Sequence, residues 1–282
     1  MKFTKMHGCG NDYVYVNCFE ESVSSPEQLA KAVSDRHFGV GSDGLVLILP
    51  SDTADCRMRM FNPDGSESEM CGNAIRCVAK YVYDKGIIHK SVVTVETLAG
   101  IKIIEVHTDK NDIAKTLTVD MGAPVTEAAE VPVIAGTSPV TDLMLSAYER
   151  EFRFTCVSMG NPHAVTFIDE AVRDFDVEKY GRVFETDSHF PRKANIEFAE
   201  IVSPERLKMR VWERGTGETL ACGTGTCATV VAACLNGICP RKPVTVELLG
   251  GELVIEWKGS DGHVYMTGPA EYTFEGEYYG KV

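Results

Sequence analysis

The order of hydrophobic and polar residues predicts many short strands and few helices. Alternating or continuous apolar runs bounded by Gly, Pro, Asn and Asp are typical of strands. They cover residues 13–16, 45–49, 56–61, 92–98, 101–106, 117–121, 155–158, 164–168, 194–200, 207–212 and, as a hairpin, 244–257. Helices are predicted at 26–37, with Ser25 as N-cap and Gln28 three residues on, from Cys71 to near Gly86, at 175–184 and at 224–236.

The two longest helical patterns begin with the same pair of residues, Cys71-Gly72 and Cys222-Gly223. The offset between them is 151 residues (222 minus 71). At that offset, residues 55–105 overlie residues 206–256 without a gap, with 15 identities in 51 positions. At an offset of 150, Gly10-Asn11 overlies Gly160-Asn161. The chain therefore contains an internal duplication, whose period is far too long for a solenoid and instead predicts two similar domains.

The predicted fold class is α+β, with two pseudo-symmetric domains. The segment after strand 117–121 contains Gly122, Pro124 and Pro132 and is the expected crossover. The tail from Tyr265 resembles residues 119–124, so we expect it to cross back and complete the first sheet. The expected domains are 1–121 with 265–282, and 122–264. A chain of 282 residues is long enough for two cores.

Composition and charge narrow the classes of function. The hydrophobic content of 44% and charged content of 24% are typical of a globular protein. A formal net charge of −13 argues against nucleic acid or an acidic membrane surface as the main partner. Residues 1–7 lack the apolar core of a signal peptide, and no run approaches the length of a membrane span, so a cytoplasmic location is expected.

Ten cysteines are expected to be reduced thiols in that compartment. No Cys-x-x-Cys pair occurs, which argues against a zinc ribbon or a thioredoxin-like site, and no metal site is predicted. Most of the thiols are expected to be small buried hydrophobic side chains. Cys71 and Cys222 differ because each precedes Gly at the start of a helix. There the N–H groups and the helix dipole favour a thiolate, and they also favour a bound carboxylate.

Two matched thiols suit a reaction that inverts a carbon bearing a hydrogen, a carboxylate and an ammonium. One base removes the proton from one face, and an acid returns a proton to the other. A thiol with an ordinary pKa of about 8.5 can be tuned for either role. A helix N-terminus aimed at the substrate carboxylate stabilises the charge that develops on it. We therefore expect Cys71 and Cys222 to face each other across a cleft between the domains.

The chain resembles the diaminopimelate epimerase family over nearly its whole length. The resemblance rests on several motifs in order: Lys5-Met6-His7-Gly8 with Gly10-Asn11-Asp12, Phe61-Asn62 with Asp64-Gly65-Ser66, Met70-Cys71-Gly72-Asn73, Met159-Gly160-Asn161-Pro162-His163, and Glu213-Arg214-Gly215 with Ala221-Cys222-Gly223-Thr224-Gly225. It implies a mixed or antiparallel sheet around a central helix in each domain. The implied activity is epimerisation of LL-2,6-diaminopimelate to the meso form, in lysine and peptidoglycan-precursor biosynthesis. No cofactor is implied.

The resemblance also implies a role for each matched residue. Cys71 and Cys222 would be the acid–base pair, with His163 and Glu213 tuning their pKa values. The backbones of Gly72, Asn73, Gly223 and Thr224 would hold the reacting carboxylate. The rest of the substrate would be read by Asn11, Asn62, Asn161, Asn195, Glu213 and Arg214. Arg214 suits a bidentate grip on the far carboxylate. A homodimer is expected.

Two positions depart from the family pattern, and two other functions stay open. Many members have Gln where this chain has Gly44, and Cys9 replaces a common Leu.

One alternative function is a cofactor-independent racemase of proline, hydroxyproline or histidine, although Arg214 and the many Asn side chains suit a substrate with a second amino acid group. The other is a non-enzymatic thiol or metal protein, against which the missing Cys-x-x-Cys spacing argues.

Overall fold

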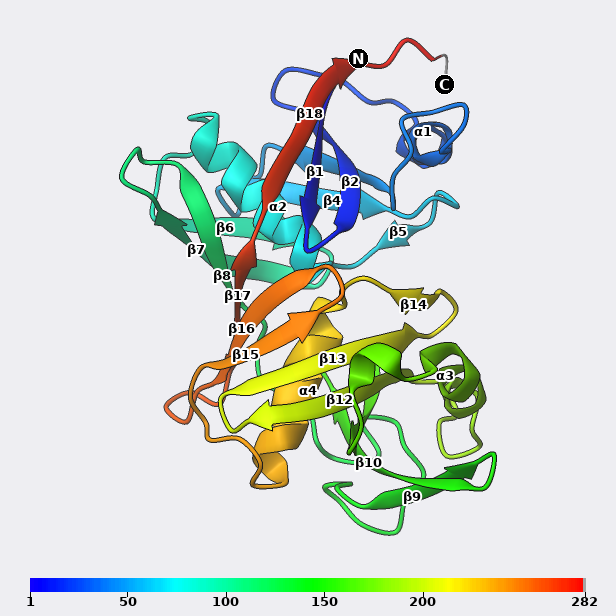
Figure 1. Cartoon of the computed structure of the whole chain (residues 1–282). Coiled ribbons are helices and arrows are strands. Elements are labelled where there is room, and N and C mark those ends of the chain that lie inside the picture. The colour runs from blue at the N-terminus through cyan, green and yellow to red at the C-terminus, as the bar shows by residue number, and fades with distance from the viewer. Residues whose placement is uncertain (281–282) are drawn as a thin grey trace. The chain divides into compact units, whose positions relative to one another are not determined.

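The computed structural model describes residues 1–280 and contains two compact units (Figure 1). The first comprises Met1–Asp120 and the C-terminal segment that begins at Thr267, and the second comprises Met121–Met266. Both units combine a mixed sheet with a buried helix, which confirms the predicted α+β class with two repeated halves.

In the first unit, a mixed sheet packs around the helix α2 (Gly72–Asp84). Its other elements are β1 (Lys2–Gly8), β2 (Asn11–Asn17), α1 (Pro26–Ser34), β3 (Leu45–Leu49), β4 (Cys56–Phe61), β5 (Glu67–Ser68), β6 (Val92–Thr97), β7 (Gly100–Thr108), β8 (Ala114–Asp120) and β18 (Glu271–Glu277). The pairs β2–β3 and β4–β6 are parallel, whereas β18–β1, β1–β2, β3–β4, β6–β7 and β7–β8 are antiparallel. Twelve of the thirteen residues of α2 are buried, against β1, β2, β6, β7 and β8.

The second unit has the same plan around α4 (Gly223–Leu235). Its other elements are β9 (Leu143–Ala147), β10 (Arg150–Ser158), β11 (Pro162–Ile168), the short helix η1 (Val172–Asp174), α3 (Val177–Glu185), β12 (Asn195–Ser203), β13 (Arg206–Glu213), β14 (Gly217–Thr219), β15 (Val244–Leu248) and β16 (Gly251–Trp257). Here β11–β12 and β13–β15 are parallel. The helix α4 packs against β10, β11, β12, β13 and β16. Strand β17 (Val264–Pro269) contains the return to the first unit.

The strand registers extend the internal duplication beyond what the sequence showed. In β3–β4, Val46 pairs with Met60, and in β12–β13, Glu197 pairs with Val211. Met60 and Val211 are 151 residues apart, so Val46 is the counterpart of Glu197. The parallel pairs place Val14 beside Leu45 and Ala164 beside Ile196, which makes Tyr13 and Gly44 the counterparts of His163 and Asn195.

Helix α1 begins at Pro26 with Ser25 as its N-cap, as predicted, but its capping bond and its C-terminal end differ from the prediction. Ser25 precedes it but makes no side-chain capping bond, so the expected capping box is wrong. The helix ends at Ser34 rather than residue 37. The cause is Asp35, whose Oδ1 accepts hydrogen bonds of 2.8 Å from the backbone N–H groups of His37 and Phe38. An Asp side chain that pairs with its own downstream backbone competes with helix continuation.

Four strands were not predicted: β1, β5, β9 and β14. Polar residues interrupt the apolar pattern in β1 (KFTKMHG), yet Lys5 there is buried because its ammonium pairs with Asp12 at 2.6 Å. Strand β18 pairs with β1, so the C-terminal tail completes the first sheet, as predicted.

Candidate active site

Cys71 is the N-cap of α2 and is partly exposed. Its backbone is extended (φ −133°, ψ 123°), so the chain turns into the helix directly after the thiol. Sγ donates to Oδ1 of Asn11 at 3.4 Å. The same oxygen lies 3.5 Å from the amide nitrogen of Asn73, in the first turn of the helix. The Cys71, Asn11 and Asn73 predicted for the site therefore come together in the first unit.

Asp43 fixes the orientation of Asn11. Its Oδ2 accepts from Asn11 Nδ2 at 2.9 Å and from the backbone N–H of Asp12 at 3.1 Å. Burial raises the pKa of the Asp43 carboxyl. With its nitrogen held by Asp43, Asn11 presents its oxygen to the thiol of Cys71. Sequence reasoning missed Asp43, which lies 32 residues from Asn11 and within an ordinary loop motif.

Arg76 places a buried guanidinium below the start of α2. Its side chain is 0% exposed and donates to Oδ1 of Asn73 at 2.9 Å and to the carbonyl of Gly72 at 3.1 Å. Nε donates to the carbonyl of Pro269 at 3.1 Å. This cation adds to the positive potential of the helix N-terminus. Sequence reasoning missed Arg76, because a lone Arg in a helix is usually solvated.

Cys222 is the N-cap of α4 and is buried. Its Sγ accepts from the backbone N–H of Gly225 at 3.4 Å and lies 3.5 Å from Oγ1 of Thr224. Burial raises the pKa of this thiol well above its ordinary value, and the carboxylates of Glu213 and Glu197 raise it further. The expected lowering of the pKa at Cys222 is therefore wrong. The helix start does favour the thiolate, but desolvation and two nearby anions outweigh it.

Glu213, at the end of β13, interacts with both Cys222 and His163. Oε1 accepts from Oγ1 of Thr219 at 2.5 Å. Burial raises the pKa of the carboxyl, while His163, Thr219 and Cys222 act in the opposite direction. The same carboxylate raises the pKa of the Cys222 thiol. The predicted proximity of Glu213, His163 and Cys222 is thus present in the second unit.

His163 lies on β11 and is buried. Nε2 lies 3.0 Å from Oδ1 of Asn161, and Nδ1 lies 2.6 Å from Oε1 of Glu197. Asn195 is adjacent: Nδ2 donates to the carbonyl of Pro162 at 3.3 Å and lies 3.4 Å from Nδ1 of His163. Sequence reasoning found Asn161 and Asn195 but missed Glu197.

The remaining predicted residues lie at turns and helix starts. Oδ1 of Asn195 accepts from the backbone N–H of Arg214 at 2.9 Å, and the exposed guanidinium donates to the carbonyl of Arg192 at 3.1 Å. The side chain of Asn62 donates to Oγ of Ser66 within a turn at 3.0 Å. Gly72, Asn73, Gly223 and Thr224 open α2 and α4, where N–H groups lack a carbonyl four residues back.

Gly44 explains one departure from the family pattern. Its backbone φ of 152° is rarely adopted by residues with a side chain, and a Cβ there would lie 2.2 Å from the carbonyl oxygen of Phe61. The same Cβ would lie 2.9 Å from the ring of Tyr13. The ring of Tyr13 therefore occupies space that a longer side chain at position 44 would need.

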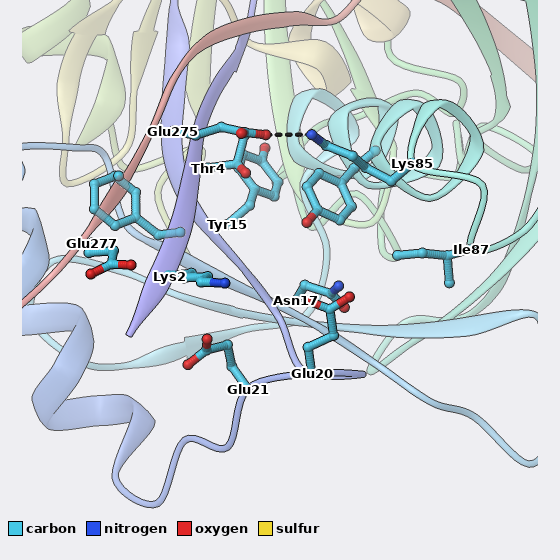
Figure 2. Close-up of a pocket in the computed structure, with 13 residues that line it drawn as sticks. Lys2, Thr4, Tyr15, Asn17, Glu20, Glu21, Lys85, Ile87, Glu275 and Glu277 are labelled. Carbon is cyan, nitrogen blue, oxygen red and sulfur yellow. Dashed lines mark hydrogen bonds and ion pairs between the residues drawn. The ribbon is translucent and has the colours of Figure 1, made fainter.

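The pocket in Figure 2 lies apart from these residues, within the first unit. It has a volume of about 470 Å³ and is bordered by β1, β2, β18 and the end of α2. The ion pair between Lys85 and Glu275, 2.5 Å long, lies on its wall. None of the predicted site residues lines it. Among residues 1–280, no three His, Cys, Asp or Glu side chains are grouped as metal ligands, and no helix could span a membrane.

The fold is shared with solved structures whose sequences are distant. A probable proline racemase from Agrobacterium radiobacter K84 aligns with 98% of this chain and 92% of its own, at a TM-score of 0.72 and 14% identity. A PhzF-family phenazine biosynthesis protein from Bacillus anthracis aligns with 99% of this chain and 98% of its own, at 0.72 and 18%. The chain therefore has the two-unit α+β fold of the racemase and PhzF structures.

Sequence comparison then identifies the family. The diaminopimelate epimerase family pattern matches residues 3–127 and 155–273. A diaminopimelate epimerase from Methanococcus maripaludis (strain C6) is 58% identical over 98% of this chain and 99% of its own length. One from Acetivibrio thermocellus is 58% identical over 98% of each. The chain belongs to the diaminopimelate epimerase family, which confirms the resemblance seen in its motifs.

Proposed function

We propose that Cys71 and Cys222 are the two bases of a diaminopimelate epimerase reaction. Family membership gives the activity: this chain is an isomerase that converts LL-diaminopimelate into meso-diaminopimelate in lysine biosynthesis. The same product serves as a peptidoglycan precursor. The mechanism is our inference from the residues. In it one thiolate removes the α-proton, and the other thiol protonates the opposite face of the carbanion without a cofactor.

The observation that carries this proposal is the position of each thiol. Cys71 and Cys222 are the N-caps of the two most deeply buried helices, one in each unit. Each is followed by Gly, so the backbone N–H groups of the first turn stay accessible to a carboxylate beside the thiol. Charge that spreads from the carbanion onto that carboxylate is then stabilised by the helix dipole.

The other predicted residues have one of two roles: they act on the two thiols, or they bind the substrate. Glu213 and His163 adjust the protonation of Cys222, and Asn11 orients the thiol of Cys71 through its hydrogen bond. Asn62, Asn161, Asn195, Glu213 and Arg214 recognise the distal amino acid group of diaminopimelate. Gly72, Asn73, Gly223 and Thr224 hold the reacting carboxylate. The two units act as the two domains of the enzyme, and the chain works as a cytoplasmic homodimer.

Single thiol variants test the mechanism. Cys71→Ala and Cys222→Ala should each reduce epimerisation of LL-diaminopimelate to below about a hundredth of the unmodified rate, because neither thiol can serve both faces. The far-ultraviolet circular dichroism should be unchanged. Cys156→Ala is a matched control, since burial raises the pKa of this thiol to about 12 and it has no proposed role. A Cys71 or Cys222 variant that kept more than a few per cent of the activity would contradict the two-base assignment.

A further inference from the structure

Glu197 is a fully buried carboxylate that the mechanism so far does not use. It lies on β12, and its side chain and that of His163 are both 0% exposed. Oε1 lies 2.6 Å from Nδ1 of His163. The other oxygen, Oε2, is buried and has no hydrogen-bond partner among the residues that the structure describes. A buried carboxylate with so few partners is costly unless its charge is balanced.

The hydrogen-bond partners of His163 define the charge of the pair. Oδ1 of Asn161 can only accept, so Nε2 of the ring carries a proton. The 2.6 Å contact between Nδ1 and Oε1 requires a second proton between those two atoms. The pair is therefore an imidazolium with a carboxylate, or an imidazole with a carboxylic acid, and has no net charge in either form. The groups that interact with the ring are Glu197 on β12, Glu213 on β13 and the amides of Asn161 and Asn195.

The internal duplication provides a comparison within one chain. The first unit has Tyr13 at the position of His163 and Val46 at the position of Glu197. It therefore has neither the imidazole nor the carboxylate, although its strands have the same register. The sheet does not need a carboxylate at this position in order to form. The acid appears only in the unit where a histidine lies beside it.

The helix that packs beside this position also differs between the two units. Ala74 in α2 is the counterpart of Gly225 in α4, at the offset of 151 residues. A Cβ at Gly225 would lie 2.6 Å from Oε1 of Glu197, closer than two such atoms can approach. The first unit thus has Val46 and Ala74 at the two positions where the second unit has Glu197 and Gly225. The space beside Cys222 is shaped to admit the carboxylate.

We propose that Glu197 is a positioning residue for the acid–base chemistry of the second unit: it holds the His163 ring at Nδ1, directs Nε2–H towards Asn161, and balances the charge of a proton on the ring. This inference rests on the proposed roles of His163 and Cys222. Glu197 contacts no substrate atom and acts only through His163.

The test compares Glu197→Gln, which keeps shape and removes charge, with Glu197→Val, which copies the first unit. Both should lower kcat at least about tenfold and change KM by less than about threefold. Because the pair loses its carboxyl group, the pH profile of kcat should differ from that of the unmodified enzyme. In nuclear magnetic resonance spectra of the unmodified enzyme, the proton shared by Nδ1 and Glu197 should resonate far downfield. That signal should vanish in Glu197→Val.

A packing control separates this role from a structural one. Gly225→Ala should destabilise the protein because of the contact with Oε1, and Glu197→Val in the same chain should restore the melting temperature without restoring kcat. Activity within twofold of the unmodified enzyme in Glu197→Gln would overturn the proposal. So would a lower kcat with an unchanged pH profile and an unchanged downfield signal. His163→Ala and Cys222→Ala belong in the same assay: if they stay active, the proposed site itself is wrong, whatever Glu197 does.

Discussion

The two proposed catalytic thiols have different neighbours, although their motifs match. Cys71 is partly exposed and bonds to a neutral amide, with the guanidinium of Arg76 buried below the first turn of its helix. Cys222 is buried beside two carboxylates. The counterpart of Arg76 in the second unit is Cys227, and the counterpart of Glu197 in the first is Val46. The first unit thus buries the Arg76 side chain next to its Cys–Gly motif, and the second buries the Glu197 side chain there.

The surroundings of Cys222 predict how its reactivity depends on pH. Its raised pKa keeps it a thiol near neutral pH, and only a thiolate reacts rapidly with iodoacetamide. Alkylation of Cys222, followed by peptide mass spectrometry, should therefore accelerate as pH rises and show no plateau below the ordinary thiol pKa. Glu213→Gln removes an anion that raises this pKa, so alkylation at a fixed pH should be faster. A rate already constant near pH 7 would show that Cys222 is a thiolate there.

Arg214→Lys tests how the distal carboxylate is recognised. A guanidinium can form two parallel hydrogen bonds to a carboxylate, whereas an ammonium is a point charge. Loss of one charge-assisted hydrogen bond should cost about 1.5–3 kcal/mol, which lowers kcat/KM by at least about tenfold. The control is Lys208→Arg, because Lys208 lies on β13, the strand that ends just before Arg214, and has no proposed role. A decrease of less than about threefold would exclude Arg214 from this grip.

At the scale of elements, sequence patterns predicted regular segments well and their ends poorly. Strands β3 and β4 have the predicted limits, because β3 is a continuous apolar run between Gly44 and Pro50 and β4 alternates buried and partly exposed residues up to Asn62. Helix α1 ended early, since the side chain of Asp35 captured two backbone N–H groups. Strand β1 was missed because its burial of Lys5 depends on Asp12, a partner that exists only after β1 and β2 pair.

The packing of α3 on β13 depends on Gly181. A Cβ at this position would lie 2.4 Å from Cβ of Trp212, whose Nε1 donates to Glu185 at 2.8 Å. In an exposed helix, Gly→Ala usually stabilises by about 1 kcal/mol. Here Gly181→Ala should instead destabilise by roughly 1–3 kcal/mol, because α3 must move away from the strand. Chemical denaturation gives the value, with exposed Val183→Ala as the control. An increase in stability would contradict this close packing.

For the whole molecule, the internal duplication was the most informative feature of the sequence. It predicted two α+β units, and its Cys–Gly motifs mark the starts of α2 and α4 as the structure has them. It could not reveal Asp43 or Glu197. Asp43 bonds to Asn11 from 32 residues away, and Glu197 bonds to His163 from 34 residues away, across neighbouring parallel strands. Such partners become visible only when the strand register is known.

The last prediction concerns the two proposed domains acting together. If both sulfurs approach one substrate carbon to roughly 3–3.5 Å from opposite faces, they are about 6–7 Å apart when the site is occupied. A disulfide needs about 2.05 Å between sulfurs, so a rotamer change and a small movement would allow one in the absence of substrate. Mild oxidant should therefore inactivate the enzyme by joining Cys71 to Cys222, and a thiol reductant should restore activity.

The chemistry of Cys222 sets the conditions of that experiment. Because burial and two carboxylates keep Cys222 protonated, oxidation should be slow near neutral pH and faster as pH rises. Saturating diaminopimelate should protect by keeping the sulfurs apart. Peptide mapping of the inactive enzyme identifies the bond, and the Cys71→Ala and Cys222→Ala variants are the controls. If both cysteines are found free, or paired with other thiols, they do not share one substrate and the two-base site must be abandoned.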